Sequence, residues 1–200
     1  MHTKSSASIR SLAVLRRNST GEDVRFLQQQ MNAIKFFRPS SNLPLLASDG
    51  IFGPITESAV KTFQSTERIL VDGIVGNQTW SALFRIIVPI VQHAFNVNPF
   101  RVEFAPGTSS AILENGVIRG DRDVYVLKAA TGQRMKFQMS SPENNAVYDL
   151  SDPLGGVLQQ ESRQGEITLP PSHDFQTGYY YISVSGTRGN AGYQLWVEII

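Results

Sequence analysis

Few of the side chains that can do acid–base, nucleophilic or metal chemistry are spaced as that chemistry requires. The three histidines, His2, His93 and His173, lie far apart and belong to no H-x-x-x-H or H-E-x-x-H pattern. A zinc site needs three or four converging ligands, and glycosidases need two acids across a cleft. Glu57 and Glu67 lie on one predicted helix, where we expect both to be solvated. Cysteine is absent, and with it any thiolate nucleophile or disulfide. We therefore predict no catalytic residue and no metal centre.

One group of acidic residues offers oxygen ligands of the kind that calcium prefers. Asp121 and Asp123 lie close together in the sequence, and Asp149 or Asp152 could complete the set. The alternative is structural, with Gly120 and Asp121 in a turn and Asp123 facing solvent at the start of a strand. Because the spacing matches no known calcium loop, we predict no cofactor and keep calcium as the alternative.

An internal repeat is the most informative pattern in the chain. The motif D-G-I-x-G-x-x-T occurs at residues 49–56 and again at residues 72–79, an offset of 23 residues. Asp-Gly is a turn dipeptide, because aspartate can bond its own backbone and glycine accepts a positive φ. Each copy therefore predicts a turn, a buried aliphatic residue (Ile51 or Ile74) and the start of a helix. Internal repeats are packing units first, so most of these residues are expected to serve the fold.

Helical segments follow both copies, and a third precedes them. Pro54 suits the first position of a helix, and the hydroxyls of Thr56 and Thr79 can satisfy free backbone N–H groups in a first turn. Residues 21–31 begin with acids, which favour the positive end of a helix, and their apolar spacing marks one buried face. Three helices are thus predicted between about residues 19 and 87.

These segments together resemble the peptidoglycan-binding domain 1 family. They read G-E-D-V-x-x-L-Q from residue 21, D-G-I-F-G-x-x-T-x-x-A-V-x-x-F-Q from residue 49 and V-D-G-I-V-G-x-x-T-W-x-x-L from residue 71. The resemblance covers about residues 12–86 and implies a small three-helix module of a kind often appended to cell-wall hydrolases. One departure is residues 36–47, a proline-containing loop that is longer than usual for the family and could alter the ligand groove.

The resemblance implies a shallow groove between the helices and the D-G turns. Peptidoglycan offers sugar faces, on which aromatic rings stack, and amide-rich stem peptides, which polar groups bind. The candidate ligand-binding residues are Arg25, for stem carboxylates, and Asp49, Phe52, Asp72, Asn77 and Trp80. A structural interpretation competes for several of them, because Trp80 shares a helical face with Leu83 and Phe84, and the two aspartates can brace their turns.

From about residue 101 the apolar period changes to two. Alternating stretches rich in aromatic and branched residues, typical of half-buried strands, lie at residues 101–104, 123–127, 134–139 and 192–199. Turn-forming residues separate them. About eight strands at roughly ten-residue spacing predict an antiparallel β-sandwich with a jelly-roll-like arrangement.

This second half resembles the bacterial pre-peptidase C-terminal (PPC-type) β-sandwich. The resemblance rests on G-D-R-D-V-Y-V-L-K-A-A-T-G-Q-R-M from residue 120, N-N-A-V-Y-D-L from residue 144, G-Y-Y-Y-I-S-V from residue 178 and N-A-G-Y-Q-L-W-V from residue 190. It implies polymer binding or a role in secretion. The predicted organisation is a flexible tail (1–11), a three-helix domain (12–88), a linker (89–100) and the sandwich (101–200).

Charge and hydropathy argue against two classes of partner. Residues 1–86 hold 10 Lys and Arg against 6 Asp and Glu, and residues 101–200 hold 8 against 11. The positive balance of the first part suits an anionic cell wall but is too weak for nucleic acid. No stretch reaches the roughly 18 apolar residues of a transmembrane segment. Arg16 and Arg17 interrupt the first apolar run, so no clear signal peptide is expected.

The sequence thus predicts a two-domain, non-catalytic peptidoglycan-binding protein of the cell envelope, periplasmic or secreted. Its sandwich is expected to bind a second polysaccharide or a wall-active enzyme, or to space the anchor. Two alternatives stay open. The chain could be a regulatory or inhibitory partner of a cell-wall hydrolase or secreted protease, or it could be an unrecognised wall hydrolase.

Overall fold

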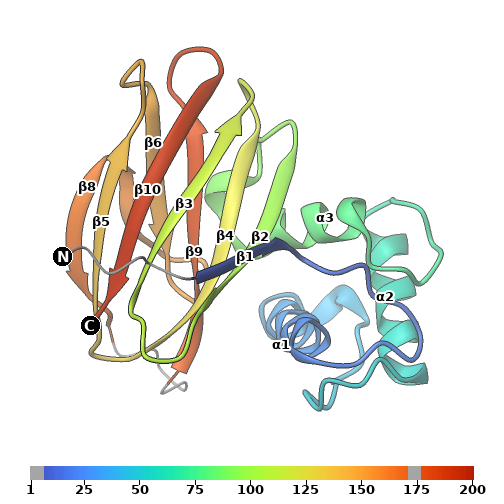
Figure 1. Cartoon of the computed structure of the whole chain (residues 1–200). Helices are drawn as coiled ribbons and strands as arrows, with labels where there is room; N and C mark the ends of the chain where they lie inside the picture. The colour runs from blue at the N-terminus through green and yellow to red at the C-terminus, as the bar shows by residue number, and fades with distance from the viewer. Residues whose placement is uncertain (1–6, 171–176) are drawn as a thin grey trace. The chain divides into compact units, whose positions relative to one another are not determined.

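The computed structural model describes residues 7–170 and 177–200 (Figure 1). The chain divides into two compact units. One is Leu12–Pro89, and the other is Ile90–Ile200 together with the segment that ends at Ser11. Each unit has its own set of buried apolar side chains, so the two-domain organisation that the sequence predicts is confirmed.

Residues 12–89 form three α-helices, as the apolar spacing predicts. They are α1 (Glu22–Phe37), α2 (Pro54–Thr66) and α3 (Asn77–Ile87), with the short 3-10 helices η1 (Pro39–Ser41) after α1 and η2 (Pro89–Val91) after α3. Pro54 stands at the start of α2, where its missing N–H has no cost. Glu22 and Asp23 stand in the first turn of α1, where the partial positive charge of the helix end stabilises them.

An aromatic cluster forms the centre of this helical unit. The ring of Phe26 stacks on Trp80 at a centroid separation of 5.9 Å and approaches Phe84 at 6.2 Å. All three side chains are buried, so α1 and α3 are joined mainly by burial of apolar surface, which stabilises by about 25 cal/mol per Å².

The repeat buries different residues from those that the sequence predicts. Ile51 and Ile74 are 54% and 37% exposed, whereas the next residues, Phe52 and Val75, are fully buried. The chain is extended after each turn, so consecutive side chains point to opposite sides. Which side is buried depends on the backbone of residues 15–20, which bridges to both copies. The predicted aliphatic position was therefore wrong by one residue.

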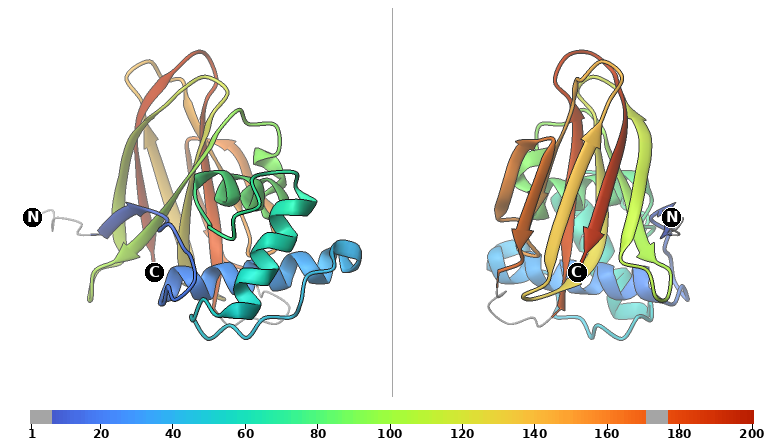
Figure 2. Two further views of the ribbon diagram at one scale, coloured as in Figure 1. Left: turned by 90° about the vertical axis from the view of Figure 1, so that its right-hand side faces the viewer. Right: turned by 60° about the vertical axis from the view of Figure 1, so that its left-hand side comes forward.

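Ten strands among the described residues form a β-sandwich of two sheets (Figures 1 and 2). The six-stranded sheet has the order β1 (Ala7–Ser11), β2 (Val97–Phe104), β4 (Arg122–Ala130), β9 (Thr177–Gly186), β6 (Ala146–Ser151), β7 (Val157–Ser162). The four-stranded sheet has the order β3 (Ser110–Val117), β10 (Ala191–Ile199), β5 (Arg134–Ser140), β8 (Gln164–Thr168). Buried side chains of both sheets form one core cluster, which contains the rings of Tyr125, Tyr148 and Tyr193.

Among the described residues, paired strands are antiparallel except for β2 and β4, which run parallel. The exception follows from the topology. Strand β3, which lies between them in the sequence, pairs in the other sheet, so the chain crosses over and returns in the same direction. The predicted antiparallel sandwich is thus observed with a single parallel pair.

Strand β1 lies within the segment that the sequence predicts as a flexible tail. Ala7–Ser11 pairs antiparallel with β2, from Ala7 opposite Phe104 to Ser11 opposite Phe100. The predicted linker, residues 89–100, likewise contains η2 and the start of β2. The five residues of β1 carry no clear alternation, and their backbone is satisfied by a strand that is distant in sequence. The helical unit is therefore inserted between the first two strands of the sandwich.

Deletion of residues 1–11 is expected to destabilise the sandwich by about 1–3 kcal/mol, because β2 loses the backbone hydrogen bonds that it forms with β1. The newly exposed edge is also expected to promote self-association. Chemical denaturation and size-exclusion chromatography at rising concentration measure both effects. Deletion of residues 1–6, which spares β1, is the control. Equal denaturation midpoints for the two deletions would contradict a structural role for β1.

Candidate binding site

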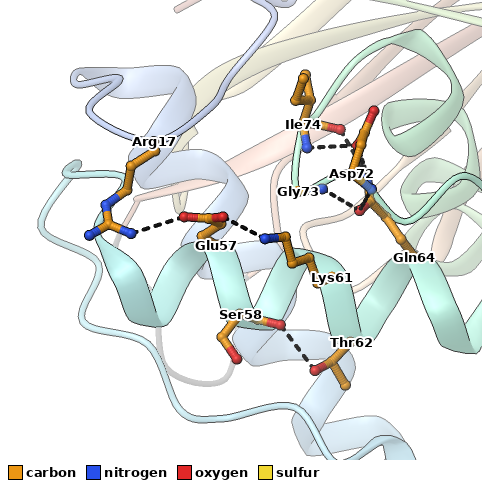
Figure 3. A network of polar contacts seen from close by, with 9 residues as sticks. All are labelled: Arg17, Glu57, Ser58, Lys61, Thr62, Gln64, Asp72, Gly73 and Ile74. Carbon is orange, nitrogen blue, oxygen red and sulfur yellow. Dashed lines mark hydrogen bonds and ion pairs between the residues drawn. The ribbon is translucent and has the colours of Figure 1, made fainter.

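A buried glutamine holds each D-G turn against the preceding helix. In the second copy, Gln64 donates from Nε2 to the Asp72 carboxylate and the Ile74 carbonyl, each at 2.9 Å, and to Thr79 Oγ1 at 3.2 Å. Its Oε1 accepts from the backbone N–H groups of Asp72 and Gly73 at 3.1 and 2.9 Å (Figure 3). One side chain, 1% exposed, thus binds both sides of the turn and the start of α3.

Gln28 repeats this arrangement in the first copy. Its Nε2 donates to Asp49 Oδ1 at 2.9 Å, to the Ile51 carbonyl at 3.0 Å and to Thr56 Oγ1 at 3.3 Å, and its Oε1 accepts from Gly50 N–H at 2.9 Å. Thr56 and Thr79 lie in the first turns of α2 and α3 as predicted, but their hydroxyls donate to the Ile51 and Ile74 carbonyls rather than bind a free backbone N–H. They take part in the glutamine network instead.

The glycine of each turn is favoured by its backbone conformation, and it lies in close contact with its surroundings. Gly50 and Gly73 have φ of 77° and 76°, a region that other residues rarely adopt. A Cβ on Gly50 would lie 3.1 Å from the Gly21 carbonyl oxygen, and a Cβ on Gly73 would lie 2.8 Å from Lys61 Cε. Each turn therefore packs directly against the preceding helix.

Asp49 and Asp72 brace the turns in which they lie. Each carboxylate accepts from the backbone N–H two residues later, Ile51 or Ile74, at 2.8 Å. These hydrogen bonds, followed by those from the glutamine amides, hold the pKa of both carboxyls below its usual range. The turns therefore contain two carboxylates that are ionised and committed to the backbone.

Acidification is expected to weaken the helical unit for this reason. A depressed folded-state pKa adds stability above the unfolded value, near 3.9 for aspartate, and this stability is lost as pH falls through the folded-state value. The midpoint temperature of thermal unfolding, measured by circular dichroism, should decrease as the pH is lowered below about 4. The double variant Asp49→Asn, Asp72→Asn should show a shallower fall. An equally steep fall in the double variant would contradict this assignment.

The charged residues beside the turns are already paired. Glu57 accepts from Lys61 at 2.6 Å and from Arg17 at 2.9 Å (Figure 3), and the hydrogen bonds from Lys61 and Arg17 hold the pKa of its carboxyl below its usual range. Arg25, the residue predicted to bind stem carboxylates, forms an ion pair with Glu22 at 3.3 Å. A ligand carboxylate would have to compete with Glu22 for it.

The other predicted ligand-binding residues fall into two groups. Phe52 and Trp80 are buried, and Trp80 Nε1 donates to the Ala13 carbonyl at 2.9 Å, so both rings belong to the core. The aspartates of the two turns and Asn77 are exposed. The repeats therefore offer polar groups to a ligand, but the face of neither ring is open for stacking on a sugar.

A pocket lies where the C-terminal ends of α1 and α2 meet η1. Its volume is about 390 Å³, within the range of roughly 300–1,000 Å³ that is typical of small-molecule sites. The side chains that line it combine an apolar set with hydroxyls and one ion pair. They are Ile34, Phe37, Arg38, Pro39, Ser40, Ser41, Leu43, Phe63, Thr66 and Glu67.

Open aromatic surface adjoins this pocket. Phe36 and Phe37, the last residues of α1, are 78% and 55% exposed, and their rings meet edge to face at a centroid distance of 5.4 Å. The sequence singled out residues 36–47 as an unusually long connection but named no ligand-binding residue there. Two adjacent phenylalanines before Pro39, at a helix end that the repeat does not cover, are the signal that could have found this surface.

The acids considered for calcium each have protein partners. Asp123 is fully buried rather than facing solvent as predicted. Its carboxylate accepts from the side-chain amides of Asn98 and Asn115 at 3.0 and 3.1 Å and from the Tyr193 hydroxyl at 2.6 Å. Burial raises the pKa of this carboxyl. Asp149 pairs with the Arg122 guanidinium, Asp121 accepts from the Asn96 amide at 3.0 Å, and Asp152 accepts from the Leu154 N–H at 2.8 Å. Among the described residues these carboxylates form no cluster that could hold a metal ion.

Two further observations concern metals and membranes. Over residues 7–170 and 177–200, no group of three or more His, Cys, Asp or Glu side chains could hold a metal ion. Of the histidines, His93 is exposed, whereas His2 and His173 lie outside the described residues. In the same part of the chain, no helix has the length and hydropathy needed to cross a membrane.

Comparison with known proteins yields relatives for part of the chain. The zinc D-Ala-D-Ala carboxypeptidase of Streptomyces albus G is 38% identical over 72 residues, which are 36% of this chain and 26% of that enzyme. The chain thus spans about a quarter of the length of this curated relative.

Solved structures of similar proteins include a lysozyme inhibitor. Aeromonas hydrophila PliG, a periplasmic inhibitor of g-type lysozyme, is 25% identical and covers 52% of this chain and 97% of its own, with a TM-score of 0.45. The pre-peptidase C-terminal domain of collagenase from Bacillus anthracis is 15% identical and covers 52% of this chain and 95% of its own, with a TM-score of 0.35.

The family comparison concerns the helical unit. Residues 20–83 match the family described as putative peptidoglycan binding domain. The match contains both repeat turns, both glutamines and all or most of each α-helix, and it agrees with the resemblance that the motifs carry. The chain therefore contains a domain of the peptidoglycan-binding family at residues 20–83.

Proposed function

We propose that this chain binds peptidoglycan in the bacterial cell envelope, through its helical domain and without breaking covalent bonds. The observation that carries the proposal is the family match at residues 20–83. The repeat geometry supports it, because each D-G turn is held by its own buried glutamine, which accepts from the turn glycine N–H and donates to the carbonyl of the following isoleucine. Both D-G repeats of the domain thus have the same local structure.

Reversible docking is the mechanism that the side chains support. The sequence provides no thiolate nucleophile, and the carboxylates of the two turns are committed to backbone hydrogen bonds. Hydroxyl, amide and carboxylate groups of a wall polymer can be bound by polar side chains and exposed rings.

The sandwich is proposed to act as an accessory module. Its buried core supports a stable body with a surface of its own. That surface would bind a second polysaccharide or a wall-active enzyme, or would space the helical domain from another partner.

Co-sedimentation of the full chain with purified sacculi tests the proposal. The chain should pellet saturably with sacculi, release no soluble sugar and stay in solution with cellulose particles. Release of sugar or peptide would instead identify a wall hydrolase, and failure to pellet would remove the peptidoglycan proposal. Tubes with an added lysozyme address the inhibitory alternative, which predicts slower sugar release than lysozyme produces alone.

A further inference from the structure

The pocket between α1, η1 and α2 is built largely by the connection at residues 36–47. Residues 36–47 contribute Phe37, the whole of η1 and Leu43 to its lining. The opposite wall comes from Phe63 and Thr66 of α2 and from Glu67, the residue that follows the helix. This connection and the end of α2 thus form a concave surface that contains no residue of the D-G repeats.

The loop that forms the pocket is held in place by hydrogen bonds to α1. The Asn32 side chain donates to the Leu46 carbonyl and accepts from the Leu46 N–H, both at 2.8 Å. Lys35 Nζ donates to the Leu43 carbonyl at 2.5 Å. Leu43 and Leu46 are 2% and 5% exposed, which anchors the loop to the core. The pocket is therefore preformed, and a ligand need not order the loop in order to bind.

The pocket lining suits a sugar that carries a small apolar substituent. Phe37, which is 55% exposed, and the exposed Pro39 provide apolar atoms at the pocket surface that can contact a methyl group. Beneath them, the buried side chains of Ile34, Leu43 and Phe63 form the floor. Ser41 Oγ is buried and makes no hydrogen bond to any described residue, so a bound hydroxyl or amide could satisfy it. The half-exposed ring of Phe37 offers a face on which a sugar ring can stack.

Charge at the rim selects among such sugars. Arg38 and Glu67 face each other at 3.6 Å, with side chains 53% and 26% exposed. An exposed ion pair of this length contributes little, so Arg38 can exchange Glu67 for a ligand carboxylate. Glu67 would remain available to accept from a hydroxyl or amide N–H.

We infer that this pocket binds the muramyl unit of peptidoglycan, an N-acetylated amino sugar with an acidic peptide-bearing substituent. The acetyl methyl would contact the apolar lining, the sugar face would stack on Phe37, and the carboxylate would pair with Arg38. The inference rests on the proposed function and names the subsite through which the helical domain would act. It places this subsite at residues 34–43 and 63–67 rather than on the D-G turns.

Calorimetric titration of the full chain with muramyl dipeptide and with chitotriose, an acetylated sugar without the acidic substituent, tests the inference. Phe37→Ala is expected to weaken binding of both ligands about tenfold. Arg38→Ala is expected to weaken binding of muramyl dipeptide about fivefold to tenfold and to leave chitotriose unchanged. Both residues are exposed, and unaltered circular dichroism will show that the variants remain folded.

Ile55→Ala is the matched control, because Ile55 is a 63% exposed apolar residue beside the first D-G turn and does not line the pocket. It should bind both ligands as the unaltered chain does. Wild-type affinity in both pocket variants, with sacculi still pelleting the unaltered chain, would overturn the pocket assignment and leave the proposed function standing. Loss of binding in Ile55→Ala alone would move the subsite to the turn. Failure of the unaltered chain to pellet with sacculi would instead remove the proposed function.

Discussion

Gln64→Ala is expected to destabilise the helical unit by about 3–5 kcal/mol, a large fraction of the total stability of a small domain. The substitution removes five contacts at once, to Asp72, Gly73, Ile74 and Thr79. The turn glycine is itself buried, so its N–H is left without a partner, at about 1–3 kcal/mol, whereas Thr79 keeps its hydrogen bond to the Ile74 carbonyl. Hydrogen exchange monitored by mass spectrometry measures this loss locally, and amides in peptides from residues 20–83 should exchange faster than in the unaltered chain.

Gln29→Ala is the matched control, because Gln29 is an exposed glutamine on α1. Its loss should change stability by less than about 0.5 kcal/mol. Gln28→Ala should resemble Gln64→Ala, since Gln28 has the same role in the first copy. If Gln64→Ala exchanged no faster than Gln29→Ala, the glutamine network would not be what holds the repeat.

Asp149→Ala is expected to destabilise the sandwich by about 3–5 kcal/mol. Asp149 is fully buried between β-strands. It accepts from the Arg122 guanidinium and, at 2.8 Å, from the backbone N–H of Glu161. Removal of the carboxylate leaves Arg122, whose side chain is only 21% exposed, as an uncompensated charge. Chemical denaturation followed by near-ultraviolet circular dichroism measures the loss.

Two further variants separate charge from packing. The double variant Arg122→Met, Asp149→Leu should recover most of the lost stability, because replacing both partners of a buried pair by apolar residues is often neutral. Glu166→Ala breaks the exposed pair with Arg134 at 3.0 Å and should have an effect below about 1 kcal/mol. An equal effect of Asp149→Ala and Glu166→Ala would show that burial does not strengthen the Arg122–Asp149 pair.

The parts of the fold that could be predicted from the sequence are those with strong local signals. Asp-Gly followed by Pro54 or by an amphipathic stretch specifies a turn and a helix start with few alternatives, and α2 and α3 begin within two residues of the predicted positions. Alternating stretches likewise located β4, β5 and β10. In these helices and strands, the spacing of apolar residues along the sequence indicates which face is buried.

Predictions failed where partners distant in sequence decide the outcome. Phe52 rather than Ile51 is buried because residues 15–20 pair with the repeat from one side. Asp123 is buried because Asn98, Asn115 and Tyr193, from three other strands, converge on its carboxylate. Strand β1 exists because β2, almost ninety residues later, offers it an edge. None of these contacts leaves a periodic signal in the chain.

The candidate site shows the same division. The resemblance identified the family and the repeats, and from these the polar residues of the two turns followed. It could not show that Phe52 and Trp80 are buried, nor that residues 36–47 fold back on α1 to enclose a pocket. The open aromatic surface depends on how α1 ends, which is a property of tertiary packing.

The central claim, that the helical domain binds peptidoglycan, is tested most directly by an NMR titration of the isotope-labelled full chain with soluble muropeptides. Amide resonances of residues 20–83 should shift saturably, with the largest changes near Phe37, Arg38 and Thr66. Resonances of the sandwich should stay in place. Saturable shifts confined to the sandwich, or no shift in the helical domain at saturating concentrations, would contradict the account.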